Sequence, residues 1–289
     1  MKRNLLKLIE EKMPTFSKGQ KRIANYVIEN YDKAAYMTAS RLGTIVDVSE
    51  STVVRFADEL GFDGYPEFQH SLREIVRTKL TSFQRIEVAN NIIGDGDILT
   101  KVLTLDADKI RHTLDGVDRD AFNATVDKLI GAKNIYIMGI RSSSYLAGFL
   151  NYNLRMIFDN VRLVSTTSGS EMFEELMNIG EDDVMIAISF PRYSKRIINA
   201  VDFAKSAGCD VTAITDSTLS PIASAADHVL IAQTDMVSFV DSLAAPMSII
   251  NAIVVAVAKK KQEELEVRLR MLEEIWDEYD VYDKTGERN

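Results

Sequence analysis

The first 80 residues carry apolar positions at helical spacing only. A capping-box sequence, SKGQ at 17–20, precedes apolar residues that recur every three or four positions and predict one helix. Similar patterns predict a second helix over 38–46 and a third over 49–60, the third bounded by a serine N-cap and a glycine stop. A further helix is expected to begin at Pro66, a residue suited to the first helical position. This region therefore reads as an all-helical unit.

From about Asn134 the pattern changes to short β-branched runs that alternate with helical stretches. Near-continuous apolar strands separated by helices are typical of a parallel sheet that is covered on both faces. We therefore expect a doubly wound α/β sandwich. The five strands are expected at 134–140, 161–165, 183–190, 210–216 and 228–232.

The predicted organisation has three parts. A helix-turn-helix domain covers 1–80, a linker with the leading helices of the next domain covers 81–133, and the α/β domain with a C-terminal helix covers 134–289. The seam is placed at about 81–95, and 101–130 reads as further helix.

Two apolar features mark the C-terminal part of the chain. Residues 247–258 form the most apolar stretch, about half of the ~20 residues that a membrane-spanning helix needs, so they are expected to form a buried helix. After them, a stripe at helical spacing is expected to pack within the chain, with some contact to a second subunit. Its residues are Leu265, Leu269, Leu272, Trp276 and Tyr279.

Charge is distributed unevenly between these parts. The chain of 289 residues has 34 Lys and Arg against 43 Asp and Glu, a net charge of −9, which excludes a uniformly basic nucleic-acid coat. Residues 1–80 carry a net charge of +2 and the remainder −11, a weak indication that the helical unit meets a polyanion.

The single cysteine, Cys209, excludes an internal disulfide and a multi-thiolate zinc site and fits a reducing, cytoplasmic compartment. No cofactor, metal or membrane contact is predicted.

The predicted helices over 38–46 and 49–60 have the proportions of a helix-turn-helix. Spacing predicts that Val53, Phe56, Ala57 and Leu60 pack inward. The opposite face, near the end that a recognition helix inserts into the major groove, carries the candidate base-contacting residues. These are Ser51, Thr52 and Arg55.

Basic residues elsewhere in the helical unit are candidates for salt-sensitive phosphate contacts. They are Lys18, Lys21, Arg22 and Arg41. The alternative is that all these positions are ordinary solvated residues of a small helical bundle, and spacing alone does not choose between the two interpretations.

Two loops of the α/β domain have anion-binding chemistry. Arg141-Ser142-Ser143-Ser144 follows the first strand, and Ser189-Phe190-Pro191-Arg192-Tyr193-Ser194 follows the third; both open helices, whose free N–H groups favour a phosphate or carboxylate. In open α/β sheets such loops lie where ligands bind. The alternative is that Ser168, after the second strand, and Ser194 are ordinary helix caps. Phosphate-cradling glycine motifs are absent from the sequence, and the three histidines are too scattered for a metal site.

The whole chain resembles the RpiR/MurR family of bacterial transcriptional regulators. The resemblance is carried by residues 37–68, notably SESTVVRF and LGFDGY, and by IYIMGIRSSS, ISFPRYS and AITDSTLSPIASAADHVL further on. It implies an N-terminal helix-turn-helix domain and a C-terminal SIS (sugar isomerase) domain that binds phosphosugars. It also implies that Ser51, Thr52 and Arg55 meet DNA, and that Ser142, Ser143, Ser189 and Ser194 line the effector site.

One departure from the family pattern changes the expected effector. Many SIS domains have S-x-S-G-x-T in the second loop, whereas this loop carries Arg192 and Tyr193, which make it stiffer and add a fixed cation. Arginine holds carboxylates well, so a sugar acid is as good a candidate as a phosphosugar.

These features predict a regulator that, as a homodimer or homotetramer, binds double-stranded operator DNA under the control of a phosphosugar or sugar acid. The alternative is an aldose-ketose phosphate isomerase with an accessory helical domain, for which Glu171 and His228 are the candidate bases. A third reading, a sugar-binding module with no role on nucleic acid, is challenged by the Ser51, Thr52 and Arg55 face. No catalytic residue is assigned under the leading hypothesis.

Overall fold

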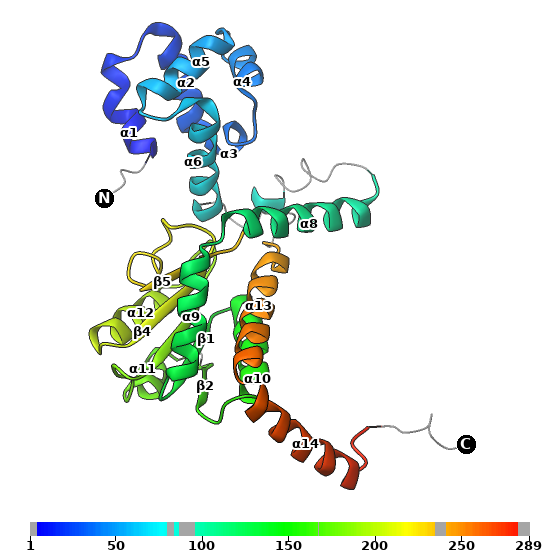
Figure 1. The fold of residues 1–289 in the computed structure, drawn as a ribbon. Coiled ribbons are helices and arrows are strands. Elements are labelled where there is room, and N and C mark those ends of the chain that lie inside the picture. The colour runs from blue at the N-terminus through cyan, green and yellow to red at the C-terminus, as the bar shows by residue number, and fades with distance from the viewer. Residues whose placement is uncertain (1–4, 80–83, 87–95, 167, 235–240, 283–289) are drawn as a thin grey trace. The chain divides into compact units, whose positions relative to one another are not determined.

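The computed structural model describes residues 5–79, 84–86, 96–166, 168–234 and 241–282 (Figure 1). Contacts divide the chain into two compact units. The helical unit lies within Met1–Ile98, and the sheet unit comprises Leu99–Asp235 with Asp241–Asn289. The predicted seam at 81–95 falls largely outside the described residues.

The helical unit consists of helices packed around a single apolar core. Its elements are α1 (Leu5–Lys12), η1 (Met13–Thr15), α2 (Lys18–Glu29), α3 (Tyr31–Ala34), α4 (Ala39–Ile45), α5 (Glu50–Glu59) and α6 (Gly64–Lys79). Phe56 of α5 lies at the centre, with its ring centroid 5.1 Å from that of Phe16 and 5.7 Å from that of Phe68. Truncating a buried phenylalanine of this kind costs about 3–5 kcal/mol, so α5 is anchored firmly on the core.

The predicted helix boundaries in this unit are confirmed by their caps. Ser17 and Gln20 form both hydrogen bonds of a capping box at α2, and the Ser49 hydroxyl accepts a hydrogen bond from the Thr52 amide at α5. Gly61 takes a φ of 93° where α5 ends. One boundary is corrected: α6 begins at Gly64, ahead of the expected Pro66.

The sheet unit is a parallel five-stranded sheet with helices on both faces, as predicted. Its helices are α8 (Ile98–Gly116), α9 (Arg119–Gly131), α10 (Ser143–Arg155), α11 (Gly169–Leu176), α12 (Lys195–Ser206), α13 (Ala244–Lys260) and α14 (Gln262–Glu278). Its strands are β1 (Ile135–Gly139), β2 (Val161–Val164), β3 (Val184–Ile188), β4 (Asp210–Thr215) and β5 (His228–Ile231). The helical segment expected over 101–130 forms two helices, α8 and α9, because Asp118 accepts hydrogen bonds from the Asp120 and Ala121 amides and begins α9.

Alternating side chains of each central strand enter different cores, which is why the sheet needs helices on both faces. Ile135 and Ile137 of β1 pack with α9, α10 and α13, whereas Tyr136 and Met138 pack with α11 and α12. The strand order is β2-β1-β3-β4-β5, and every neighbouring pair is parallel. The order reverses between β1 and β3, which is the place where open sheets of this kind bind ligands.

The C-terminal stripe packs on the core of its own chain only in part. α13 is buried along one side only, since Val255 on it is 65% exposed, and α14 has no buried residue. Leu265 packs on the core, whereas Leu269 and Tyr279 are 36% and 72% exposed. The expected packing within the chain thus holds for Leu265 at the start of the stripe, and the expected contact of the remainder with a second subunit stays a prediction.

Candidate functional site

The helices α4 and α5 meet in a tight turn at 46–49. The Val48 amide donates a hydrogen bond to the Gly43 carbonyl at 2.9 Å. A side chain at Gly43 would place its Cβ 2.8 Å from the Val48 carbonyl oxygen, so glycine permits this close approach. Asp47, at the apex, has a φ of 53°. The two helices thus have the connection of a helix-turn-helix.

The two faces of α5 separate as predicted. Val53, Phe56 and Ala57 are completely buried, and Leu60 just beyond the helix is 5% exposed. Ser51 and Arg55 are exposed on the other side, and Thr52 is partly buried. The exposed side carries the chemistry expected of a reader of base edges, and its contact with DNA stays a prediction.

Hydroxyl groups cluster at the amino end of α5. The Ser49 Oγ lies 2.9 Å from the Ser51 Oγ and 2.8 Å from the Thr52 Oγ1. These hydrogen bonds position the hydroxyls beside the first free amides of the helix, where a DNA phosphate is bound well.

The basic residues singled out in the sequence belong to α2 and α4, both of which pack against α5. Lys18, Lys21, Arg22 and Arg41 are all exposed. A methyl group at Gly19 of α2 would lie 3.5 Å from Thr52 and from Val48, so the start of α2 is beside the turn. Sequence reasoning missed one contact: Arg22 forms an ion pair of 2.9 Å with Asp47. In the free protein this acid offsets the charge of Arg22.

A second candidate site lies at the edge of the sheet where β1 and β3 end. The two strands are neighbours, with Gly139 paired to Ile188, so the chain leaves both at the same edge. A Cβ at Gly139 would lie 2.3 Å from the Ser143 carbonyl oxygen, which means that α10 begins directly against the strand end. The parallel register therefore brings the two serine loops together at the crossover, as the sequence predicted.

The serines at this edge differ in exposure. Ser143 is 4% exposed and Ser189 is 5% exposed, whereas Ser142 is exposed. Ser194 is the N-cap of α12, and its hydroxyl accepts a hydrogen bond from the Arg196 amide at 3.3 Å. Ser168 likewise caps α11. The cap interpretation thus holds for both residues, and a role of Ser194 in effector binding stays a prediction.

The second loop is tied to the next strand. The Tyr193 hydroxyl donates a hydrogen bond of 2.9 Å to Asp216, which is 4% exposed at the end of β4. Arg192 before it is exposed and has a φ of 68°. Sequence reasoning named Arg192 and Tyr193 but missed Asp216, whose only sequence signal was a carboxylate directly after an apolar strand.

Comparison with known proteins identifies both units. The description "Helix-turn-helix domain, rpiR family" matches residues 3–79, and "SIS domain" matches residues 128–256. The helical unit is thus an rpiR-family helix-turn-helix domain, and the sheet unit is an SIS domain. The HTH-type transcriptional regulator HexR of Escherichia coli is 24% identical, over 74% of this chain and 73% of its own length.

Two solved structures share the fold of this chain. The sugar isomerase domain of the RpiR transcription factor from Sphaerobacter thermophilus has a TM-score of 0.59 and 26% identity, and covers 62% of this chain and 99% of its own. The Vibrio vulnificus NanR protein, solved with ManNAc-6P, has a TM-score of 0.59 and 21% identity, and covers 95% of this chain and 98% of its own.

The two bases considered for an isomerase lie apart in the sheet unit. His228 starts β5, at the opposite edge of the sheet from the serine loops, with its Nε2 3.6 Å from Asp210. Glu171, in the first turn of α11, is hydrogen bonded to Thr166 after β2. His228 is therefore not a base at the crossover, which leaves Glu171 as the single candidate from that pair.

Cys209 is a packing residue. It is completely buried, and burial raises the pKa of its thiol to about 12, with the nearby Asp183 and Asp210 adding to the shift.

Across the residues that the structure describes, His, Cys, Asp and Glu form no cluster of three or more able to hold a metal ion. No helix in that part of the chain has the length and apolar character of a membrane span.

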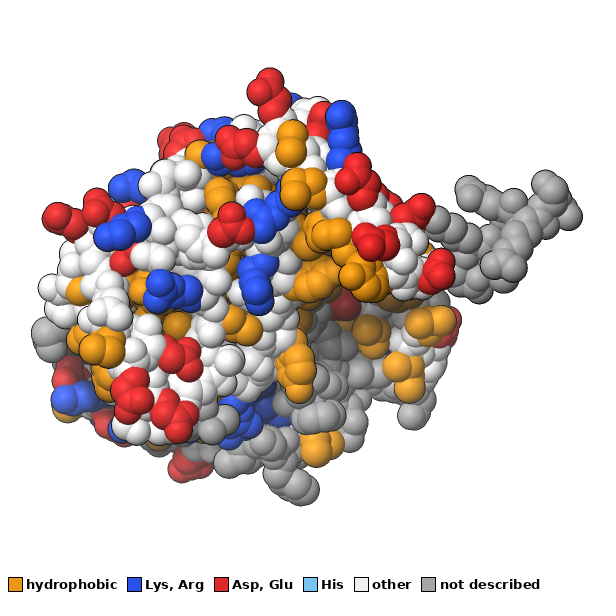
Figure 2. Space-filling view, turned by 90° about the horizontal axis from the view of Figure 1, so that it is seen from below, with side chains coloured by type: hydrophobic (Ala, Val, Ile, Leu, Met, Phe, Trp, Pro, Cys, Tyr) orange, Lys and Arg blue, Asp and Glu red, His pale blue; other side chains and the backbone are white. Residues whose placement is uncertain are grey.

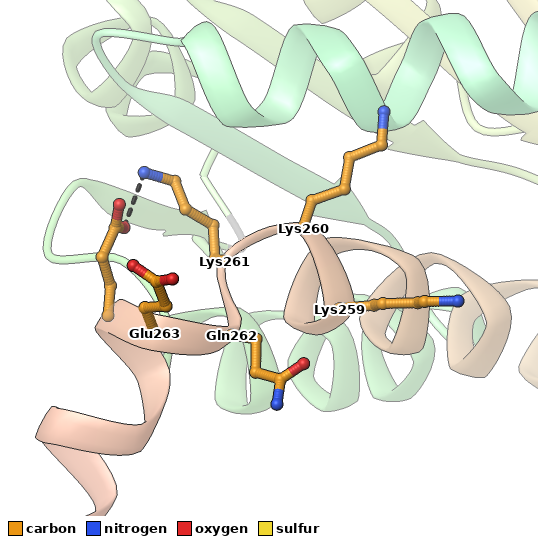
Figure 3. Close-up of a pocket in the computed structure, with 6 residues that line it drawn as sticks. Lys259, Lys260, Lys261, Gln262 and Glu263 are labelled. Atoms are coloured by element: carbon orange, nitrogen blue, oxygen red, sulfur yellow. Dashed lines mark ion pairs between the residues drawn. The ribbon is translucent and has the colours of Figure 1, made fainter.

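A cavity of about 420 Å³ lies at the junction of α13 and α14. It is lined by Lys259, Lys260, Lys261, Gln262, Glu263 and Glu264. Lys261 pairs with Glu264 at 2.6 Å, Lys260 pairs with Asp127, and the three lysine side chains point in different directions (Figure 3). The ammonium groups do not converge, so this cavity lacks the arrangement of an anion site.

Proposed function

We propose that this chain is a transcriptional regulator that reads operator DNA with α5 and is controlled by an anionic sugar bound where β1 and β3 end. The separation of faces on α5 carries the proposal. Val53, Phe56 and Ala57 anchor the helix in the core, while Ser51, Thr52 and Arg55 offer hydroxyls and a guanidinium on the other side. That arrangement fits a helix held rigidly by one face and presented to the major groove by the other.

The effector site is supported by the convergence of two serine loops at the crossover. Two helices of the sheet unit, α10 and α12, begin at this edge, so their free amides are available to an anion there. Ser142, Ser143, Ser189 and Ser194 can donate further hydrogen bonds. Such neutral donors bind a phosphate without a strongly basic surface, which suits a unit with excess negative charge. ManNAc-6P, the ligand of the NanR structure, belongs to the phosphosugar class proposed here.

A homodimer or homotetramer is proposed because hydrophobic side chains gather on the surface of the sheet unit (Figure 2). On α8 the polarity is inverted: Lys109 and Thr113 are buried, whereas Leu99, Leu103 and Leu114 are 57–70% exposed. Further exposed residues lie on α10 and α14, among them Tyr145, Tyr152, Val267 and Met271. Apolar area of this extent is expected to be covered by a second copy, and a dimer would present two α5 helices to a two-fold symmetric operator.

Control of DNA binding requires the effector to prefer one arrangement of the subunits. A ligand shifts an equilibrium only by its difference in affinity for the two states. We propose that binding at the crossover moves α10 or α12 and thereby changes the spacing of the recognition helices.

The DNA-reading part is tested by selecting genomic fragments that the purified protein retains at roughly 0.15 M salt, where phosphate-only binding is substantially screened. A recurring inverted repeat is expected. Arg55→Ala is expected to weaken binding to that repeat by about 1–3 kcal/mol, or roughly 5- to 150-fold. Lys33→Ala, which removes an exposed charge on α3, serves as the matched control and is expected to bind normally. Equal binding by wild type and Arg55→Ala would refute the assignment of α5.

A further inference from the structure

Two arginines occupy strained backbone positions in the loops that leave β1 and β3. Arg141 has a φ of 59° and Arg192 a φ of 68°. Residues with a side chain are uncommon in this left-handed region, where glycine is favoured, because the Cβ crowds the backbone there. Because β1 and β3 are neighbours in register, both arginines lie on the rim of the crossover. Strain retained in two adjacent loops indicates that the surrounding structure holds them in place.

The surroundings of Arg192 show how it is held. Phe190 and Pro191, on one side of it in the chain, are buried. On the other side, the Tyr193 hydroxyl donates to Asp216, and Thr215 donates to the same carboxylate oxygen at 3.2 Å. Ser194 then caps α12. The backbone at Arg192 is therefore fixed relative to β3 and β4, so its guanidinium starts from a defined point on the rim.

A phosphate group at the crossover does not require this arginine. The amino ends of α10 and α12, with the buried Ser143 and Ser189, already offer neutral donors of the kind that bind phosphate. A guanidinium adds a planar pair of N–H donors that matches a carboxylate in a two-pronged contact. An arginine whose backbone is held on the rim beside such neutral donors thus fits a ligand with a second anionic group.

We propose that Arg192 determines specificity for a sugar phosphate that also carries a carboxylate, with Arg141 adding positive charge on the same rim. This inference rests on the proposed function, since it names the ligand class of the same effector site. It differs from that function in requiring two anionic groups on one ligand.

The test compares two probes that differ only at C1. In 6-phosphogluconate this carbon is a carboxylate, and in glucitol 6-phosphate it is a hydroxymethyl group. Binding of both to the full chain is measured by titration calorimetry for wild type, Arg192→Gly and Arg155→Gln. Glycine suits the φ of 68°, so Arg192→Gly removes the guanidinium without straining the loop. Arg155→Gln removes the same charge at the other end of α10, roughly 20 Å along the helix.

Wild type is expected to bind 6-phosphogluconate about ten-fold or more tightly than glucitol 6-phosphate, the scale of a charge-assisted contact. Arg192→Gly is expected to lose that preference while its affinity for glucitol 6-phosphate stays within about three-fold of wild type, and Arg155→Gln is expected to behave as wild type.

Three outcomes would overturn the inference. They are equal affinities of wild type for the two probes, an Arg192→Gly protein that weakens both probes equally, and a wild type that binds neither at millimolar concentration. Retention of the selected DNA is measured on the same preparation. A protein that retains DNA without preferring 6-phosphogluconate contradicts the carboxylate inference alone, whereas one that does not retain DNA contradicts the proposed function.

Discussion

Gly139 is the position where a single added methyl group should disturb the effector site most. It ends β1, and the first turn of α10 lies directly against it. A Cβ there would be 2.3 Å from the Ser143 carbonyl oxygen, 2.7 Å from the Ser143 carbonyl carbon and 3.2 Å from the Ala147 Cβ. All three atoms belong to α10, so Gly139→Ala forces the helix and the strand end apart.

The size of the effect follows from these distances. Non-bonded heavy atoms pack best at about 3.5–4.0 Å, so the first turn must move by about 1 Å. Forcing an extra methyl group into a packed interior costs about 1–3 kcal/mol. For a unit of this size, 1 kcal/mol corresponds to about 2–4 °C in Tm, which gives an expected decrease of about 2–12 °C.

The assay is a calorimetric scan of the full chain that follows the transition of the sheet unit, with Gly148→Ala as the matched control. Gly148 lies within the same helix, and a Cβ there would have no neighbour within 4 Å. Alanine is the better helix former by about 0.5–1 kcal/mol, so this control is expected to raise Tm. The two substitutions are chemically identical and are predicted to act with opposite sign.

Binding of 6-phosphogluconate provides the second readout. Gly139→Ala is expected to weaken it, because the displaced first turn carries Ser143, whereas Gly148→Ala is expected to leave it unchanged. A Gly139→Ala protein that melts and binds as wild type would refute the reasoning that α10 begins in tight contact with the end of β1.

Three further predictions concern charge and reactivity. Asp47→Asn removes the acidic partner of Arg22, and asparagine tolerates the φ of 53° at this position. The affinity for DNA, measured by fluorescence anisotropy at low salt, is expected to rise about two- to ten-fold. An unchanged or lower affinity would contradict the placement of this turn near DNA. Cys209, buried with a pKa of about 12, is expected to resist a thiol reagent at pH 8 in the folded protein and react fully in denaturant; equally fast labelling of both forms would show that the site is open. Burial alone would raise the pKa of Asp227, but hydrogen bonds from Lys205 and the Val211 amide outweigh it and hold that pKa below its usual value. The contribution of the Asp227 carboxylate to stability is therefore present above the unfolded pKa of about 3.9 and is lost as pH falls through the lower folded pKa. The urea midpoint of Asp227→Asn is expected to be below that of wild type at pH 7 and to converge with it in acid. A difference in midpoint that persists in strong acid would point to another cause.

The sheet could be predicted from the sequence because its strands are short apolar runs between clear breaks. The order of the strands in the sheet is harder to predict from the sequence than the strands themselves. The parallel register of β1 and β3 places Ser143 and Ser189 at one edge of the sheet. In the helical unit, local signals such as Ser49 and Gly61 marked the ends of α5. The four-residue helix α3 escaped prediction because a segment so short has no periodicity and depends on packing against α2 and α6.

Contacts between distant residues account for most of what sequence reasoning missed. The ion pair of Arg22 with Asp47 and the hydrogen bond of Tyr193 with Asp216 each join residues more than 20 positions apart. No local pattern encodes such a pair. The exposed α14 shows another limit, because the spacing of an apolar stripe does not say how much of it packs within the chain and how much on a second subunit.

The central claim is that one chain couples a DNA-reading helix to an anionic-sugar site. Its most direct test is to measure the affinity of the protein for a selected operator fragment with and without saturating 6-phosphogluconate. Coupling between two sites is usually worth about 1–3 kcal/mol, so the dissociation constant is expected to change by roughly 5- to 150-fold in wild type. In Arg192→Gly the same change is expected to need about ten-fold more 6-phosphogluconate. An operator affinity that stays constant while calorimetry shows the ligand bound would contradict the account.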